Sequence, residues 1–333
     1  MIRMSGIGDV LWSTPLLANL RLSYPEAHIA YVVRTASAFV LEHNPDVDEI
    51  IRFEDESIRY QLGFLRRLRR KRFDLSIDLI CSPATAIQSV ASGARIRIGY
   101  DFRLRERLYT HRLSAREANH GHEVEFNLFA LRALELPERT RSLVWHVSDD
   151  ERARAEEQWK ALGFDNETPV VALIPTGGFP SKKWPLAHWQ ALVADPRFDS
   201  ARFLVFWGSD AERRDAEAIA AAAPHVRLEP GGTLRDSAAL LDRCAAAVGN
   251  DSGPAHIATA LGLPAVMFYG PTNPESQGPW SDRAEVLRIP DVETRCCRRL
   301  DCPDPVCMTD IPPARTAEAL ERALQRGRGE AAR

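Results

Sequence analysis

Short apolar runs rich in β-branched residues alternate along this chain with helical segments. The apolar runs predict strands at 1–4, 32–33, 50–51, 75–79, 96–98, 170–174, 203–206, 246–248 and 265–268. The segments between them predict helices at 10–22, 58–72, 83–91, 124–136, 151–162, 186–193, 211–222, 237–244, 255–261 and 316–325. Strands that alternate with helices favour parallel sheets covered on both faces, so the pattern predicts an α/β fold.

The chain divides best near its middle. At 333 residues it is long for one core and sufficient for two domains. The segments 137–139 and 148–150 are polar and separate two halves that show the same alternation. We therefore expect an N-terminal Rossmann-like domain over 1–148 and a C-terminal one over 149–333, with parallel sheets facing a central cleft. The last helix is a candidate to pack back on the N-terminal domain.

Composition places the chain among soluble globular proteins. Hydrophobic residues make up 45% and charged residues 27%, which is ordinary for that class. The sequence contains no run of about 18 apolar residues, so we expect no transmembrane helix. It does not begin with a basic segment followed by an apolar stretch, so we expect no signal peptide. The expected location is cytoplasmic, with a peripheral position at the inner face of the inner membrane left open.

Positive charge is concentrated in one segment. The net charge of −3 argues against a general nucleic-acid binder, so we expect no nucleic-acid partner. Between Arg59 and Arg112, however, 13 Lys or Arg residues face only 4 Asp or Glu. This excess fits a solvated helix face with charged loops. It equally fits a surface that binds an anionic acceptor molecule or an anionic membrane.

Four of the six cysteines, Cys296, Cys297, Cys302 and Cys307, are close together in the sequence. A cytosolic location predicts that they are mostly reduced. Their spacing lacks the paired C-x2-C knuckles of a zinc site. We expect no cofactor and no metal among the catalytic and binding residues. A structural metal, a local disulfide and a compact thiol-rich loop stay open as interpretations.

The most informative segment joins a predicted strand to a predicted helix. The run Gly249-Asn250-Asp251-Ser252-Gly253 follows the strand at 246–248 and precedes the helix that contains His256. The first turn of a helix has unpaired backbone N–H groups and the positive end of the helix dipole. Such a joint suits a phosphate group.

A second joint of this kind lies at the start of the chain, in Ser5-Gly6-Ile7-Gly8-Asp9-Val10. Its two glycines permit a tight turn and a close approach to a ligand. Because Leu11 stands where G-x-G-x-x-G requires its third glycine, nicotinamide binding is disfavoured. Asp9 is either a helix-capping residue or a general base.

Two further joints contain residues that could bind a diphosphate or a ribose. The loop 175–185 contains Thr176, two glycines and the cations Lys182 and Lys183, one of which could neutralise a leaving diphosphate. The joint at 206–212 contains Asp210 and Glu212. These carboxylates either cap the helix or bind ribose hydroxyls.

Together these segments resemble glycosyltransferase family 9, the lipopolysaccharide heptosyltransferases. The resemblance extends over nearly the whole chain. It rests on 5–10 with Thr14-Pro15-Leu16, on 175–185 with its Ser-Lys-x-Trp-Pro core, on 250–256 with Gly270-Pro271-Thr272, and on the cysteine-bearing tail 302–311.

The resemblance implies a GT-B fold, with the acceptor bound by the first domain and the nucleotide-sugar donor by the second. It implies inverting, metal-independent transfer, most simply of heptose from ADP-heptose to an anionic, lipid-linked saccharide acceptor of the lipopolysaccharide core. The implied catalytic base is Asp9, and Ser5, Gly6 and Gly8 form an acceptor or phosphate loop. The implied donor site comprises Thr176, Lys182, Glu212, Asp251, Ser252, Gly253 and His256. Another nucleotide-sugar, a GT-B-fold nucleotide-sugar epimerase and a non-catalytic binding relative stay open as alternatives.

Overall fold

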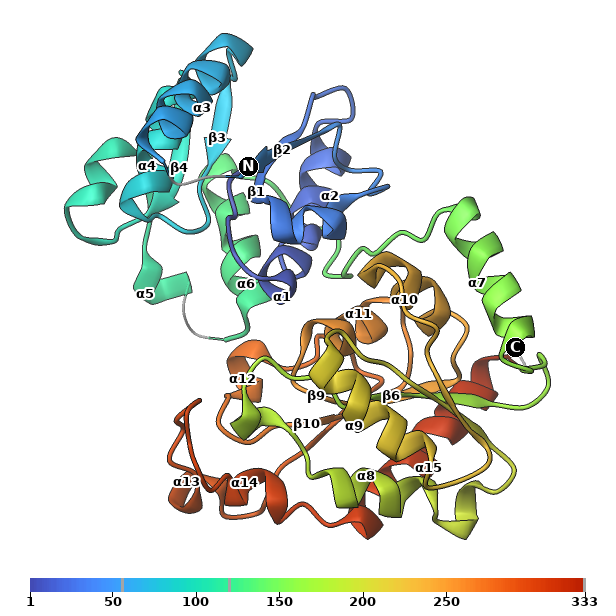
Figure 1. The fold of residues 1–333 in the computed structure, drawn as a ribbon. Helices are drawn as coiled ribbons and strands as arrows, with labels where there is room; N and C mark the ends of the chain where they lie inside the picture. The colour runs from blue at the N-terminus through green and yellow to red at the C-terminus, as the bar shows by residue number, and fades with distance from the viewer. Residues whose placement is uncertain (55–56, 119–120, 332–333) are drawn as a thin grey trace. The chain divides into compact units, whose positions relative to one another are not determined.

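The computed structural model describes residues 1–54, 57–118 and 121–331. It divides the chain into two compact units, Met1–His146 and Val147–Arg333 (Figure 1). The break between the units falls close to the boundary expected from the sequence. The acceptor and donor roles assigned to the two domains stay predictions.

The first unit is an α/β unit with parallel strands. Its strands are β1 (Ala30–Arg34), β2 (Glu49–Phe53), β3 (Leu75–Ile77), β4 (Ile96–Tyr100) and β5 (His111–Leu113). Its helices are α1 (Ile7–Leu11), α2 (Thr14–Ser23), α3 (Ile58–Lys71), α4 (Pro83–Ala91), α5 (Ala115–Ala118) and α6 (Glu123–Leu128). Three 3₁₀ helices complete the described part of the unit: η1 (Thr35–Leu41), η2 (Arg103–Leu108) and η3 (Phe129–Leu134).

The opening segment joins two small sheets of the first unit. Strand β1 pairs with β2, and β4 lies between β3 and β5. Ile2 forms parallel bridges to Val32 on one side and to Asp78 on the other. The resulting order is β2, β1, opening segment, β3, β4, β5, which is the 3-2-1-4-5-6 order of a Rossmann sheet. The turn that contains Asp9 therefore follows the first strand position of that sheet.

The prediction of one continuous helix over 10–22 is wrong in one respect, because the structure has two helices there, α1 and α2. Pro15 has no N–H to donate to the carbonyl of Leu11. The hydroxyl of Thr14 donates to that carbonyl instead, at 2.7 Å, and the hydroxyl of Ser13 donates to Val10 O at 2.7 Å. These local side-chain hydrogen bonds end one helix and begin the next.

The second unit contains a parallel sheet in the order β11-β10-β9-β6-β7-β8, again 3-2-1-4-5-6. Its strands are β6 (Val170–Ile174), β7 (Arg202–Val205), β8 (Val226–Leu228), β9 (Ala246–Asn250), β10 (Ala265–Phe268) and β11 (Ala284–Leu287). Its helices are α7 (Asp149–Ala161), α8 (Leu186–Val193), α9 (Asp210–Ala220), α10 (Leu234–Leu241), α11 (Gly253–Ala260), α12 (Pro274–Gln277), α13 (Val292–Arg295), α14 (Val306–Thr309) and α15 (Pro313–Ala331), with short 3₁₀ turns η4 (Pro180–Lys182) and η5 (Pro196–Phe198).

Most predicted elements are confirmed, and the three strands that were not predicted share one cause. Strands β5, β8 and β11 lie at or next to sheet edges and are partly exposed, so they lack a continuous apolar run. Helix α10 begins three residues earlier than predicted, because Thr233 caps it and accepts a hydrogen bond from the N–H of Asp236. The segment predicted as a helix over 124–136 is helical but tightens from α6 into η3.

The core of the second unit surrounds its sheet. It includes Trp184, Trp189 and Phe268, whose rings contact one another. Helix α15 packs on β9, β10, β11 and α8, which all belong to its own unit. In the part of the chain that the structure describes, we find no helix with the length and apolar character needed to cross a bilayer.

Candidate active site

The donor-site candidates lie where the strand order of the second sheet reverses. Strands β6 and β9 are neighbours, and the chain leaves them toward opposite edges of the sheet. Asn250, the last residue of β9, is fully buried. Its amide donates to Pro175 O at 2.8 Å and its Oδ1 accepts from the N–H of Trp184 at 2.9 Å. This amide therefore attaches the loop after β6 to the end of β9, at the position where open α/β sheets bind ligands.

An ion pair joins these two loops. Nζ of Lys182 lies 2.5 Å from Oδ2 of Asp251, and the other carboxylate oxygen lies 3.1 Å from Nε2 of His256. Burial alone would raise the pKa of Asp251. The hydrogen bond from His256 and the charge of Lys182 outweigh that effect and hold the pKa well below its usual range. Asp251 is thus an ionised carboxylate in a largely buried site.

Two residues that the sequence analysis did not assign to the site complete this cluster. The hydroxyl of Thr272 donates to Oδ2 of Asp251 at 2.8 Å. The hydroxyl of Tyr269 lies 3.5 Å from Nε2 of His256 and donates to Gln277 O at 3.0 Å. Both residues follow strand β10, so the same carboxyl-end rule that located Asp251 could have found them.

Helix α11 begins beside the ion pair. Gly253 is its first residue, so its unpaired N–H groups and the positive end of its dipole follow directly after Asp251. The hydroxyl of Ser252 lies 3.3 Å from that of Thr176 on the loop after β6. An added Cβ at Gly249 would lie 3.1 Å from both Ala255 and Ile174, which shows how closely α11 packs on the sheet. The geometry brings two hydroxyls, a lysine and a helix N-terminus together.

Glu212 connects the neighbouring loop. Its carboxylate accepts from the N–H of Gly177 at 3.0 Å, the N–H of Gly208 at 3.2 Å and the hydroxyl of Ser209 at 3.2 Å. Lys183 lies 3.8 Å from the same carboxylate. The loops after β6 and β7 are therefore fastened to each other through Glu212. Its contact with a ribose stays a prediction.

In the first unit, Asp9 is held from two sides. Nη2 of Arg3 donates to its Oδ1 at 3.0 Å, and the N–H of Gly6 donates to its Oδ2 at 3.2 Å. The Asp9 side chain keeps 30% of its surface exposed, so it can reach a substrate. The same nitrogen of Arg3 lies 3.0 Å from Oε2 of Glu123. The sequence analysis missed both partners. Arg3 lies just outside the motif 5–10, and Glu123 is remote from Asp9 in the chain.

The turn before Asp9 differs from the phosphate loop that the sequence suggested. The N–H of Gly6, one of the groups assigned to a phosphate, donates to the Asp9 carboxylate. The hydroxyl of Ser37 donates to the carbonyl of Ser5 at 2.9 Å, which anchors the turn to η1. A phosphate or acceptor contact of Ser5, Gly6 and Gly8 stays a prediction.

Five of the six cysteines lie in the second unit, and Cys81 lies in the first. All six lie within the described residues and are free thiols. Cys297 is exposed, and hydrogen bonding to the backbone at Arg299 and to the Cys302 thiol lowers its pKa. Over residues 1–54, 57–118 and 121–331, no group of three or more His, Cys, Asp or Glu is arranged to hold a metal ion.

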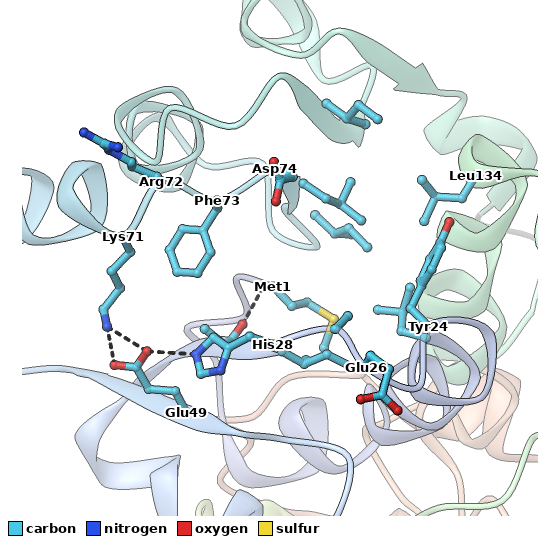
Figure 2. Close-up of a pocket in the computed structure, with 17 residues that line it drawn as sticks. Met1, Tyr24, Glu26, His28, Glu49, Lys71, Arg72, Phe73, Asp74 and Leu134 are labelled. Carbon is cyan, nitrogen blue, oxygen red and sulfur yellow. Dashed lines mark hydrogen bonds and ion pairs between the residues drawn. The ribbon is translucent and has the colours of Figure 1, made fainter.

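A cavity of about 670 Å³ in the first unit lies elsewhere (Figure 2). Its lining includes the first residues of the four strands β1 to β4, namely Ala30, Glu49, Leu75 and Ile96. It therefore lies at the amino ends of these strands, whereas Asp9 follows the carboxyl end of the opening segment. Neither Asp9 nor any other predicted site residue lines it. We do not assign substrate binding to this cavity, because open α/β sheets bind ligands at the other edge.

Comparison with known proteins shows the family of this chain. The family model described as glycosyltransferase family 9 (heptosyltransferase) matches residues 62–306, a range that contains the whole Lys182–Asp251–His256 cluster. Lipopolysaccharide heptosyltransferase 2 of Escherichia coli K12 is 29% identical over 310 residues, which cover 87% of each chain.

Two solved structures are similar along nearly their full length. One is a family 9 glycosyl transferase from Veillonella parvula, with a TM-score of 0.83, 22% identity and coverage of 98% of this chain and 96% of that one. The other is E. coli ADP-heptose LPS heptosyltransferase II, with a TM-score of 0.77, 27% identity and coverage of 98% of both chains. These likenesses confirm the predicted GT-B fold class. The chain belongs to glycosyltransferase family 9.

Proposed function

We propose that this protein transfers a heptose from ADP-heptose to a saccharide acceptor of the lipopolysaccharide core, with inversion at the anomeric carbon. The observation that carries the proposal is the family 9 match over residues 62–306, which includes the ion-paired cluster at the sheet's switch point. The names of the similar E. coli proteins, a lipopolysaccharide heptosyltransferase and an ADP-heptose LPS heptosyltransferase, indicate the sugar, the nucleotide and the acceptor class.

The second unit would bind the donor through its diphosphate. A diphosphate placed at the start of α11 would accept hydrogen bonds from the helix N–H groups and from Ser252 and Thr176. Lys182 keeps 16% of its side-chain surface exposed and could share its charge between Asp251 and the phosphates. As the bond from the sugar to the diphosphate breaks, this cation would stabilise the negative charge on the departing ADP.

Asp9 would act as the general base. In the proposed step the acceptor hydroxyl oxygen attacks the anomeric carbon from the face opposite the diphosphate. The new C–O bond forms, the old one breaks, ADP leaves with the electron pair, and Asp9 takes the hydroxyl proton. Base catalysis of this kind accelerates a reaction by about 10²–10⁴-fold. Alignment of the two substrates would add a further rate enhancement. The residues named here perform the reaction without a metal ion.

The direct test is transfer by the purified full chain. We expect ADP release and a product of increased mass only when ADP-heptose and a lipopolysaccharide-core acceptor are both present. The NMR coupling of the anomeric proton should show inversion, and EDTA should leave the rate unchanged. An isomerised donor sugar in the absence of acceptor would instead identify an epimerase.

The variant Asp9→Asn tests the base. We expect turnover to fall about 10²-fold or more, as for loss of a general base, while calorimetry shows unchanged ADP affinity. Asp46→Asn, in a turn of the same unit, is the matched control and should retain normal turnover. Normal turnover in Asp9→Asn would exclude Asp9 as the base, and lost ADP binding would assign it a structural role.

A further inference from the structure

Helix α3 presents a basic and apolar face to solvent. Phe64 and Leu68 are buried in the core of the first unit. On the opposite side of the helix, by its 3.6-residue period, lie four arginines and two aliphatic residues. They are Ile58, Arg59, Leu62, Arg66, Arg69 and Arg70, and each is exposed. The 14 residues of the helix include no Asp or Glu.

Exposed aliphatic residues also lie on two neighbouring elements, α4 and η2. Helix α4 packs beside α3 (Figure 1). The 3₁₀ helix η2 contacts α4. Ile58 and Leu62 on α3 are 80% and 50% exposed, Ile87 and Val90 on α4 are 51% and 43% exposed, and Leu104 on η2 is 74% exposed. We call these five residues, with Arg59, Arg66, Arg69 and Arg70, the α3–α4–η2 surface.

Much of the positive charge on this surface is not neutralised locally. Lys71 at the end of α3 pairs with Glu49, and Arg67 lies over the Phe64 ring and donates to Arg52 O. For Arg66 and Arg70, no ion-pair partner lies within the described ranges of the chain. Even with the three acidic residues at 54–56, the segment 54–72 contains seven basic residues. The surface therefore attracts anions.

We propose that the α3–α4–η2 surface docks on a lipid bilayer that contains anionic phospholipids. The chemistry fits a lipid surface because arginines bind phosphate headgroups, while interspersed aliphatic side chains enter the acyl boundary. The five exposed apolar residues are aliphatic, so the surface offers no aromatic platform for stacking nucleic-acid bases. The proposal concerns binding and does not depend on the proposed transfer reaction.

Vesicle flotation with the full chain tests the proposal. We expect binding to vesicles of equal parts phosphatidylglycerol and phosphatidylcholine, and little binding to phosphatidylcholine alone. Binding should weaken in about 0.5 M NaCl, because salt screens the arginine–phosphate attraction. Equal binding to both vesicle types, or none to either, would overturn the proposal.

Two double variants separate the charged and apolar contributions. Arg66→Gln/Arg70→Gln and Ile58→Ser/Leu62→Ser should each reduce the vesicle partition coefficient by about tenfold or more, as expected for two surface contacts. All four positions are exposed, so thermal unfolding should be unchanged. The matched control Lys160→Gln/Arg214→Gln removes two exposed cations from the second unit and should bind as the wild type. Wild-type binding by both test variants would overturn the proposal.

A lipid-free acceptor distinguishes lipid docking from binding of the acceptor itself. Arg66→Gln/Arg70→Gln should transfer sugar normally to a water-soluble core saccharide but slowly to the same saccharide anchored in anionic vesicles. An equal loss on both acceptors would mean that these arginines bind the saccharide, and would overturn lipid docking. Lack of transfer by the wild type would refute the proposed function and leave the vesicle result standing.

Discussion

The guanidinium of Arg3 donates through Nη2 to Oδ1 of Asp9 at 3.0 Å, within a segment where only five residues separate them. The same guanidinium donates through Nη1 to the carbonyl of Leu79 at 3.0 Å, which fixes it to the segment after β3. Burial opposes the charge of Arg3, but Asp9 and Glu123 outweigh it and raise its pKa. Arg3 is therefore a charged group that orients the Asp9 carboxylate.

Replacing Arg3 should slow transfer more than it weakens substrate binding. In Arg3→Met the Asp9 carboxylate loses its orienting donor, so we expect kcat to fall at least about tenfold, a loss of about 1.4 kcal/mol in transition-state stabilisation. KM for ADP-heptose should change little. Arg3→Lys keeps the charge and should recover part of the rate. An unchanged kcat in a folded Arg3→Met protein would refute this positioning role.

Lys182 should matter more for donor affinity than its neighbour Lys183. Lys182 pairs with buried Asp251 at the start of α11, whereas Lys183 lies 3.8 Å from Glu212 and 3.9 Å from Asp215. We expect Lys182→Ala to weaken ADP binding about tenfold or more, the loss of one charge-assisted contact of about 1.5–3 kcal/mol. Calorimetry with Lys183→Ala as the control checks this. Equal affinities in the wild type and Lys182→Ala would remove Lys182 from the donor site.

The ionised Asp251 carboxylate should stabilise the folded chain at neutral pH and lose this effect in acid. Its pKa is lower in the folded than in the unfolded chain, so its stabilising effect is full above the unfolded value and is lost as pH falls. Removing one partner of a buried pair costs about 3–5 kcal/mol. Asp251→Asn should therefore unfold more easily than the wild type in urea at pH 7, with a smaller difference at about pH 3. A difference independent of pH would contradict the ion pair.

Glu229 should limit stability at alkaline pH. It is 2% exposed, and burial raises its pKa to about 7. A pKa raised by folding means that stability is full below the unfolded value, near 4.3, and is lost as pH rises through about 7. Glu229→Gln should be more stable than the wild type at pH 8, by up to about 3 kcal/mol, and similar at pH 4. The exposed control Glu293→Gln should show no such difference.

Cys297 should be the most reactive thiol. It is exposed with a lowered pKa, whereas burial raises the pKa of Cys81 to about 12 and also raises that of Cys244. Because the thiolate is the nucleophile, iodoacetamide should modify Cys297 first and spare the two buried thiols until the chain unfolds. Peptide mass spectrometry with Cys297→Ser as the control checks this order. Early labelling of Cys81 would contradict it.

The hydrophobic pattern predicted the elements that are buried on both faces. Strands β6, β9 and β10 are buried along their whole length. In the sequence β6 and β10 are therefore continuous apolar runs, and β9 is apolar over 246–248. Strands β5 and β11 contain exposed or half-exposed positions and show no such run. Local periodicity therefore identified the central strands of each sheet and the edge strand β2, and it missed the edge strands β5, β8 and β11.

The candidate site also combines features that are local in the sequence with contacts that are not. Glycine, capping and charged residues at the joints 5–10, 175–185 and 250–256 are local signals, so they marked these segments as candidates for binding a phosphate or holding a base. Which of these groups contact one another depends on how the chain folds. Lys182 reaches Asp251 because β6 and β9 are neighbours in the sheet, and Glu123 reaches Arg3 from a remote helix. Strand order and helix packing set such contacts, and they depend on burial across the whole unit rather than on any local pattern.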